Sequence, residues 1–558
     1  MTPIAKIQKG IQYWKRNGTR SFIQRLIHPR GRKPLTYEAW YRENRSPAAA
    51  ASIAEDPAEG VTIRVLSDRE SFSRAAREGV EEDFALFCPP DGVLEPDALT
   101  LFRERLALVP DADMIYADEG SLTPSGRHTA PCFKPDYSPE YLLCVNYIGY
   151  PLLVKASVLE AAGGVPERND ELSYWDMVLR CAGAAGRIEH IAEPLCHAPV
   201  SSGNRPSEVK TALGTRLVRG GALPDGAADL VTARIASAGM DGAAEFAKSR
   251  RCVRPVIRPK GEPKVSIIIP NKDQAETLTT CVSSILSKST YRNYEIIIVE
   301  NNSTQEKTFS CYDELAALDG RISVERYAGK FNFSKINNFG AERSDGEYLI
   351  LLNNDTEVIT CDWIERMLGI CQSEGVGIVG AKLLYNDGTV QHAGVVIGIG
   401  GGASHVLSRE DRSEDGYLCR LSALVDVSAV TAACMMIPSA LYREMGGLDE
   451  SFEVNFNDVD LCLRVREAGY RVVMNAGAEL YHYESKSRGL DNSGEKFERF
   501  KDEVYRFRTR WKKLLDEGDP YYSKNLSLMY IDCRPRYARE YFEFIDQIEK
   551  ERSSAPHV

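Results

Sequence analysis

The chain has 558 residues, of which 43% are hydrophobic and 27% are charged, and its formal net charge is −11. This length exceeds one ordinary hydrophobic core and predicts two domains with connectors. The acidic balance argues against a general nucleic-acid-binding protein. No window reaches the roughly 18 to 20 uninterrupted apolar residues of a membrane span, because the most apolar one, residues 424–437, contains Asp426.

The N-terminal residues 1–33 form a basic arm, with nine Lys or Arg and no acidic residue. Ile4, Ile7, Ile11 and Trp14 recur at helical spacing, which predicts a short amphipathic helix. Such a helix could lie on an anionic membrane or pack on the protein's own body, and the pattern fits both. We interpret residues 1–60 as a basic, partly helical arm and linker.

The chain has no apolar segment followed by small residues near its start, so we expect no cleaved secretory signal and a cytoplasmic protein. Its 14 cysteines include no Cys-x-x-Cys pair and lie in apolar segments. This pattern predicts buried, reduced thiols rather than disulfides or a zinc site.

Residues 61–200 show a first α/β pattern. An apolar, strand-like run at residues 84–88 ends in Pro89-Pro90-Asp91-Gly92, and a helix is expected to follow. The strand-then-acid layout occurs again at residues 347–355, which suggests an internal duplication. We expect a degenerate copy, because prolines stand where a metal site needs oxygen side chains and we find no strand-helix-strand pattern before them. Residues 201–263, with a helix expected at 212–219, are interpreted as a connector.

Residues 264–490 show a second, complete α/β pattern. Buried strands are expected at residues 265–270 and 296–299 with a helix between them, which implies a right-handed parallel crossover. No glycine-rich phosphate loop follows the first strand, so a nucleotide-dependent oxidoreductase is disfavoured. A third strand ends at Asn353-Asn354-Asp355. Because parallel sheets bind ligands at the carboxyl ends of their strands, Asp355 is expected to anchor a metal and a diphosphate.

Two later segments add candidate groups. Asn457 is expected to cap a helix and to place Asp458 in its first turn, where the helix dipole favours an ionised carboxylate that can act as a general base. His482 is a metal-competent imidazole, and Lys486 and Arg488 follow it. Residues 491–558 are interpreted as a C-terminal helical tail on the outside of the protein or at an oligomer contact.

Taken together, these motifs resemble the inverting glycosyltransferases of family 2, which have the GT-A fold, a Rossmann-like, mixed but mostly parallel sheet. The similarity is strongest to the rhamnosyltransferase-like branch that builds bacterial surface polysaccharides such as O-antigen. The matching segments occur in the family's order and are residues 265–273, 300–303, 331–340, 353–355, 457–464 and 482–489. Residues 61–200 resemble the later part of a second, truncated domain of this kind.

The resemblance implies a set of site residues. Asp458 is the expected catalytic base, Asp355 and His482 are the expected ligands of Mg²⁺ or Mn²⁺, and Thr431 is expected on the acceptor side. The residues expected to bind the nucleotide sugar are Pro270, Glu300, Asn302, Asn338, Asn354, Lys486 and Arg488. Asn353 replaces the first acid of the family's Asp-x-Asp signature, so Asp355 is the one carboxylate expected at the metal.

The implied activity is a metal-dependent glycosyltransferase of the hexosyltransferase type. It would move a sugar, with rhamnose as the first candidate, from a nucleoside diphosphate donor to a growing lipid-linked polysaccharide. The expected location is the cytoplasmic face of the inner membrane, with peripheral contact through residues 1–33. Two rivals remain: a different donor sugar, and a non-catalytic glycan-binding or assembly scaffold in which both domains have decayed.

Overall fold

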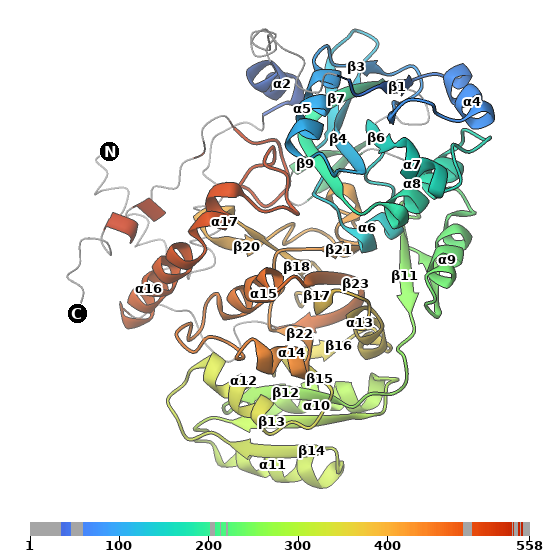
Figure 1. Cartoon of the computed structure of the whole chain (residues 1–558). Coiled ribbons are helices and arrows are strands. Elements are labelled where there is room, and N and C mark those ends of the chain that lie inside the picture. Colours follow the sequence, from blue (N-terminus) through green and yellow to red (C-terminus); the bar gives the residue numbers. More distant parts are fainter. Residues whose placement is uncertain are drawn as a thin grey trace.

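The structure, a computed structural model, describes residues 35–45, 60–200, 207–211, 214–218, 221–483, 494–537, 540, 545–546 and 548–550. Figure 1 shows one sheet at the top of the molecule, a second sheet through its middle and bottom, and α9 with β11 running along one side between them. The expected basic arm, residues 1–33, lies outside the described residues, and the first described helix is α2 (Tyr37–Asn44), which begins at the Thr36 cap.

The first sheet has seven strands. Their bounds are β1 Ile63–Leu66, β2 Phe84–Phe87, β3 Val93–Leu94, β4 Met114–Leu122, β5 His128–Cys132, β6 Leu152–Lys155 and β7 Ile188–Pro199. The helices of this part are α4 Arg69–Glu78, α5 Ala98–Leu108, α6 Pro139–Cys144, α7 Ala156–Ala161 and α8 Glu171–Ala184. All four residues of β2 are buried, as the apolar run at its position predicts.

The second sheet has ten strands. Their bounds are β12 Val265–Asn271, β13 Tyr294–Glu300, β14 Ile322–Arg326, β15 Tyr348–Leu352, β16 Thr356–Val358, β17 Val376–Leu384, β18 Val390–His392, β21 Leu424–Asp426, β22 Cys434–Pro438 and β23 Arg471–His482. The helices are α10 Ala275–Lys288, α11 Glu306–Leu318, α12 Phe333–Glu342, α13 Trp363–Cys371, α14 Ser439–Glu444 and α15 Asn457–Glu467. A small pair, β19 Val395–Ile397 and β20 Ala403–His405, lies beside it.

The second sheet is mixed. Its order is β14-β13-β12-β15-β22-β17-β23-β16, with β18 on β17 and β21 on β23. Strands β14, β13, β12, β15, β17 and β23 run in one direction, and the other four run against them. The predicted α/β class, with a mixed and mostly parallel sheet preceded by a partial α/β domain, is therefore confirmed.

The first sheet repeats the second in topology. Its order is β1-β2-β6-β4-β7-β3, with β5 on β4, and this matches β12-β15-β22-β17-β23-β16, with β18 on β17. Each pairing also keeps its parallel or antiparallel sense. Within the described residues, the first sheet has no counterpart of β13 and β14. The predicted duplication is thus present, and the missing strands lie on the edge where the second sheet continues beyond β12.

Two expectations about these regions are wrong. A strand-helix-strand unit does precede Pro89, because β1 pairs in parallel with β2 across α4, which begins with a capping box between Asp68 and Ser71. The segment expected to be helical at 212–219 instead contributes to the hairpin of β8 (Ser207–Thr211) and β9 (Gly214–Val218). The connector also folds further, into α9 (Ala227–Ser237) and the hairpin of β10 (Gly242–Phe246) and β11 (Val253–Ile257).

The described part of the C-terminal tail is helical in α16 (Gly494–Arg510), in α17 (Lys512–Glu517) and again at residues 545–546 and 548–550. Residues 518–537 then return to the body of the protein, where the Asn525 amide donates to Asp118 Oδ2 at 3.2 Å in the first sheet. Buried Asp519 accepts hydrogen bonds from the Ile397 amide and the Ser428 hydroxyl, at 2.8 and 2.7 Å. This segment therefore joins both halves and is not the external helical tail that the sequence suggests.

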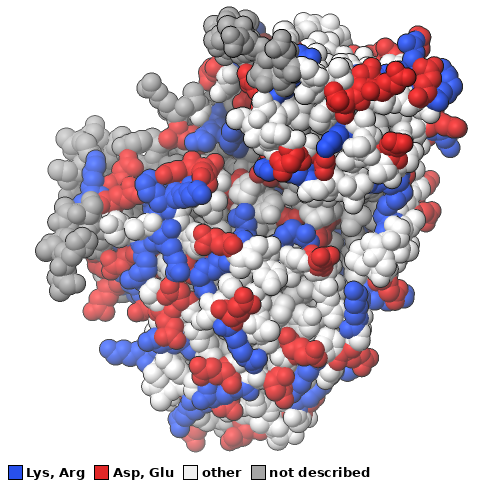
Figure 2. Space-filling model, in the orientation of Figure 1, with Lys and Arg blue, Asp and Glu red and all other residues white. Residues whose placement is uncertain are grey.

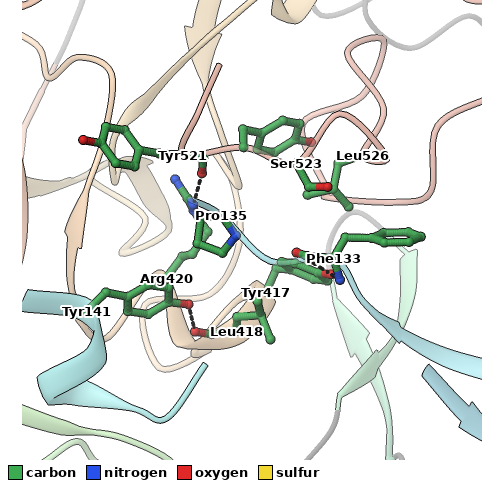
Figure 3. Close-up of a pocket in the computed structure, with 10 residues that line it drawn as sticks. Phe133, Pro135, Tyr141, Tyr417, Leu418, Arg420, Tyr521, Ser523 and Leu526 are labelled. Carbon is green, nitrogen blue, oxygen red and sulfur yellow. Dashed lines mark hydrogen bonds between the residues drawn. The ribbon is translucent and has the colours of Figure 1, made fainter. Parts of the chain in front are cut away.

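The two halves also meet around a small aromatic cavity (Figure 3). The Tyr417 hydroxyl accepts the Phe133 amide at 2.7 Å, the Tyr141 hydroxyl donates to the Leu418 carbonyl, and Arg420 donates to the Tyr521 carbonyl at 2.7 Å. The cavity volume is about 10 Å³. A cavity of this size holds at most about one water molecule, so it is an interface gap and not a substrate site.

Two features of the described residues concern surface charge and membrane spans. Lys and Arg alternate with Asp and Glu over the face in Figure 2, without a large field of one sign. No helix among the described residues has the length and apolarity needed to cross a bilayer. All 14 cysteines are free and all but Cys361 are buried, as the apolar segments around them predict.

Candidate active site

Asp355 and His482 lie side by side at the end of the second sheet. Strand β15 ends at Leu352 and delivers Asn353, Asn354 and Asp355, after which Thr356 of β16 pairs directly opposite His482 of β23. His482 Nε2 is 3.1 Å from Asp355 Oδ1, and Asp355 is 4% exposed. The structure thus brings together the carboxylate and the imidazole that the sequence assigned to a metal.

The orientation of the His482 ring is fixed by Gln391, which the sequence did not single out. Gln391 lies on the three-residue strand β18, and its Oε1 is 2.6 Å from His482 Nδ1. A carbonyl oxygen at Nδ1 favours the tautomer with the proton there, so the lone pair of Nε2 faces Asp355. Metal-binding histidines are held in this way by a partner on the second ring nitrogen.

The donor set at this position fits a divalent cation. Asp355 offers carboxylate oxygens and His482 offers an imidazole nitrogen, to which the Asn353 side-chain amide nitrogen donates at 3.1 Å. Mg²⁺ and Mn²⁺ prefer oxygen ligands, and Mn²⁺ also accepts imidazole. Asn354 is used differently, because its amide donates to Asn271 Oδ1 and ties the end of β15 to the end of β12.

Asp458 lies in the first turn of α15 and is half-buried. Its Oδ1 accepts the Val459 amide at 2.8 Å and its Oδ2 accepts the Ala432 amide at 3.0 Å. The helix begins at Asn457, not after it, and Phe456 occupies the cap position without a side-chain hydrogen bond. The expected Asn457 cap is therefore wrong, because Asn457 Oδ1 instead accepts the neighbouring Asp458 amide at 2.7 Å.

A short loop, residues 431–433, links Asp458 to the strand that carries Asp355. The Ala432 amide binds Asp458, and the adjacent Ala433 carbonyl accepts the Asn353 amide at 3.1 Å. Thr431, the predicted acceptor-side residue, begins this loop and donates its amide to His392 Nε2 at 3.3 Å. Burial lowers the pKa of His392 well below its ordinary value, with smaller contributions from His405 and His482, so this imidazole accepts as a neutral ring.

The predicted nucleotide pocket lies where β12, β13 and β14 end. Asn271, next to Pro270, pairs with Glu300 across β12 and β13, and Glu300 pairs with Arg326 across β13 and β14. Glu300 is 3% exposed, and its carboxylate accepts the Ser303 amide at 2.5 Å and contacts Arg326 Nε at 3.3 Å. Arg326 is a cation at this edge that sequence reasoning missed, and Pro270 and Glu300 lie at neighbouring strand ends as expected.

The other residues predicted to bind the nucleotide sugar do not share one location. Asn302 is exposed, adopts a left-handed backbone with φ 56°, and donates to the Gly329 carbonyl at 2.8 Å. Asn338 binds the turn before residue 449, because its side chain donates to the Leu448 carbonyl and accepts from the Leu448 amide and the Tyr442 hydroxyl. Lys486 and Arg488 lie outside the described residues.

The first sheet lacks counterparts of the two key carboxylates. Val93 of β3 pairs with His197 as Thr356 pairs with His482, so the residue equivalent to Asp355 is Gly92. Helix α8 keeps an Asp–Arg ion pair, Asp176–Arg180, in the place of Asp460–Arg464 on α15. By the same offset, Tyr174 stands where α15 has Asp458.

The fold and these residues define an α/β protein with one intact carboxylate–imidazole site and one altered copy. Residues 266–424 match the family model described as Glycosyl transferase family 2. The match includes Pro270, Glu300 and Asp355, and it ends before Asp458 and His482. This segment therefore carries a family 2 glycosyl transferase domain.

Longer relatives match most of the chain. It is 38% identical over 484 residues to "Uncharacterized protein y4gI" of Sinorhizobium fredii, covering 85% of this chain and 52% of that protein. It is 35% identical over 502 residues to the O-antigen biosynthesis protein RfbC of Myxococcus xanthus, covering 88% of this chain and 38% of that protein. The chain thus spans about half or less of the length of these relatives.

Among solved structures, the mannosyltransferase PcManGT from Pyrobaculum calidifontis, in complex with GDP-Man and Mn²⁺, overlaps 46% of this chain and 66% of its own chain. The sequence identity is 14% and the TM-score is 0.35. The fold assignment therefore rests on the strand order and pairing described above.

Proposed function

We propose that this chain is an inverting, metal-dependent glycosyltransferase that extends a lipid-linked surface polysaccharide, with rhamnose as the first candidate sugar. The observation that carries the proposal is the convergence of Asp355, His482 and Asp458 on one loop-and-strand framework, within and just beyond a family 2 domain. The name of the Myxococcus xanthus relative supports the assignment to O-antigen or related polysaccharides.

Asp458 is the proposed base. Each of its carboxylate oxygens accepts one backbone amide, which holds the group in place and leaves a lone pair on each oxygen. The position in the first turn places the carboxylate at the positive end of the α15 dipole. An acceptor hydroxyl loses its proton to Asp458 as its oxygen bonds to the anomeric carbon, and the bond to the diphosphate breaks with the electron pair leaving on the phosphate. This single displacement inverts the anomeric configuration.

Asp355 and His482 are the proposed holders of Mg²⁺ or Mn²⁺. A cation bound there would offset the negative charge that develops on the departing nucleoside diphosphate. Pro270 and Glu300, at the neighbouring strand ends, are the proposed contacts for base and ribose. Arg326 joins them as a further cation beside Glu300.

The first sheet is proposed to act as a scaffold or acceptor platform rather than a second catalytic centre. It has Gly92 and Tyr174 at the positions of Asp355 and Asp458, and both carboxylates are required for the proposed chemistry. The proposed boundaries remain residues 1–60, 61–200, 201–263, 264–490 and 491–558, with the tail now assigned as a contact between both halves.

The direct test is to incubate the purified chain with Mn²⁺ and a panel of nucleoside diphosphate sugars carrying rhamnose, galactose, glucose or an N-acetylhexosamine. One donor should raise the melting temperature and undergo slow hydrolysis. Asp355→Ala should abolish the Mn²⁺-dependent part of both signals. If no donor binds, or if cells carrying Asp355→Ala and Asp458→Asn extend the glycan normally, the chain is a non-catalytic scaffold.

A further inference from the structure

A second cluster of metal-competent side chains lies in the first sheet, far in sequence from Asp355. Glu95 follows β3, His128 begins β5, and His197 lies on β7. One ligand atom from each of the three lies within 4.8 Å of the others. Their side chains are 13%, 19% and 2% exposed, so the group is largely shielded from solvent.

Helix α2 provides a partner for each member of this cluster. The Tyr37 hydroxyl is 3.1 Å from His197 Nε2, and Glu38 Oε2 is 3.4 Å from His128 Nδ1. The Tyr41 hydroxyl donates to Glu95 Oε2 at 2.6 Å. These contacts leave His197 Nδ1, His128 Nε2 and Glu95 Oε1 as the natural ligand atoms. Partners on the second ring nitrogen are what orient the histidines of metal sites.

We propose that Glu95, His128 and His197 bind a Zn²⁺ ion that fastens α2 to the first sheet. Two imidazoles and one carboxylate form a donor set that suits Zn²⁺. His197 Nδ1 and Glu95 Oε1 are 3.0 Å apart. Two ligands at about 2.0–2.1 Å from a tetrahedral ion lie about 3.3 Å apart, so this spacing needs little adjustment.

The sheet repeat explains where this site comes from. His197 pairs with Val93 as His482 pairs with Thr356, so the imidazole is retained while Asp355 is replaced by Gly92. Gly120 makes room for the cluster, because a Cβ there would lie 2.7 Å from His197 Nε2 and 2.8 Å from the Tyr37 hydroxyl. The proposed Zn²⁺ site of the first sheet thus lies at the position of the proposed metal site of the second sheet. Its role is structural and independent of the proposed transferase reaction.

The test uses the full-length Asp355→Ala chain, which removes the carboxylate of the other site, after stripping with a chelator. We expect it to bind one equivalent of Zn²⁺ in competition with a chromophoric chelator, and Co²⁺ in its place should give visible absorption bands. His128→Gln should abolish both signals. Glu38→Gln, which removes the carboxylate beside His128 Nδ1 without changing a ligand, should weaken Zn²⁺ binding about 10–100-fold.

His190→Gln is the control, because His190 is a buried histidine on β7, the strand of His197, and pairs with Asp118 and Asp136 instead of the cluster. It should bind Zn²⁺ as the Asp355→Ala chain does. The proposal is overturned if the Asp355→Ala chain binds no Zn²⁺ at micromolar concentration, or if Glu38→Gln and His128→Gln both bind with unchanged affinity. The first of these outcomes is measured without any substitution in the cluster. A failure of a cluster variant to fold therefore cannot explain it away.

Discussion

Asp458→Asn is the substitution that examines the proposed chemistry most directly. Asparagine keeps the shape of the side chain but cannot accept a proton at neutral pH. A positioned general base contributes about 10²–10⁴ in rate, which equals about 3–5 kcal/mol of transition-state stabilisation. We therefore expect kcat to fall by that factor while the donor KM stays within about twofold, since Asp458 is assigned to the acceptor.

The same change has a structural cost that must be measured separately. Both Asp458 oxygens accept backbone amides, from Val459 and Ala432, and an asparagine can satisfy only one of them. Leaving one buried donor unpaired costs about 1–3 kcal/mol of folding stability. Urea unfolding should show a loss of this size, so transfer must be assayed well below the transition.

Asp460→Asn is the matched control, two residues further along the same helix. Asp460 is fully buried and accepts hydrogen bonds from Arg464 at 2.8 Å and Trp511 at 3.1 Å. Its loss should destabilise the chain at least as much as Asp458→Asn but leave kcat within about tenfold. The assay is transfer of labelled sugar from the donor found in the panel to lipid-linked acceptor. If Asp458→Asn keeps more than a tenth of kcat, Asp458 is not the base.

Three further outcomes are expected. Gln391→Met removes the oxygen that holds His482 Nδ1, so the Mn²⁺ concentration for half-maximal activity should rise about 10–100-fold, and an unchanged value would remove Gln391 from the metal site. Burial, aided by the negative charge of Glu140, raises the pKa of Asp426 well above its usual value. The folded state therefore binds the proton of the Asp426 carboxyl more tightly than the unfolded state does. The free energy of unfolding should fall as pH rises above about 4, the pKa of an unfolded aspartate. Asp426→Asn should flatten that decline in urea titrations from pH 5 to 8; the same slope in both proteins would contradict the assignment. Deleting residues 1–33 should weaken sedimentation with anionic liposomes, and equal binding would refute a membrane role for the arm.

The sequence contains enough information to predict strands β12, β13 and β15 and to place Asp355 at a strand end, whereas His482 was assigned to the metal through the family resemblance. Long apolar runs such as residues 265–270 can only be buried strands, and the carboxyl ends of parallel strands must share one edge. By contrast, the sequence pattern did not indicate β1. This strand has only four residues, most of them half-exposed and one of them Arg64, and they show no clear hydrophobic period. A weak edge strand gives almost no local signal.

The side-chain contacts that depend on tertiary structure could not be predicted from the sequence. Gln391 lies on a three-residue strand whose position depends on β17, so nothing local indicates that it holds His482. Asn338 was grouped with binding residues by its motif, yet its side chain bonds to the turn at Leu448, 110 residues away. Both cases reflect partners chosen by packing between distant segments, whereas Asp355 was predicted from its strand end together with the order of the family's motifs.

The returning C-terminal segment has a consequence for how the chain is made. Asn525 lies 407 residues after Asp118, whose buried carboxylate it binds. At about 5–20 residues per second, a ribosome needs roughly 20–80 s to synthesise that interval. During this time the first sheet must exist without one of its internal partners, exposed at the surface that residues 518–537 later cover. Completion of the first sheet therefore waits until residues 518–537 have been synthesised.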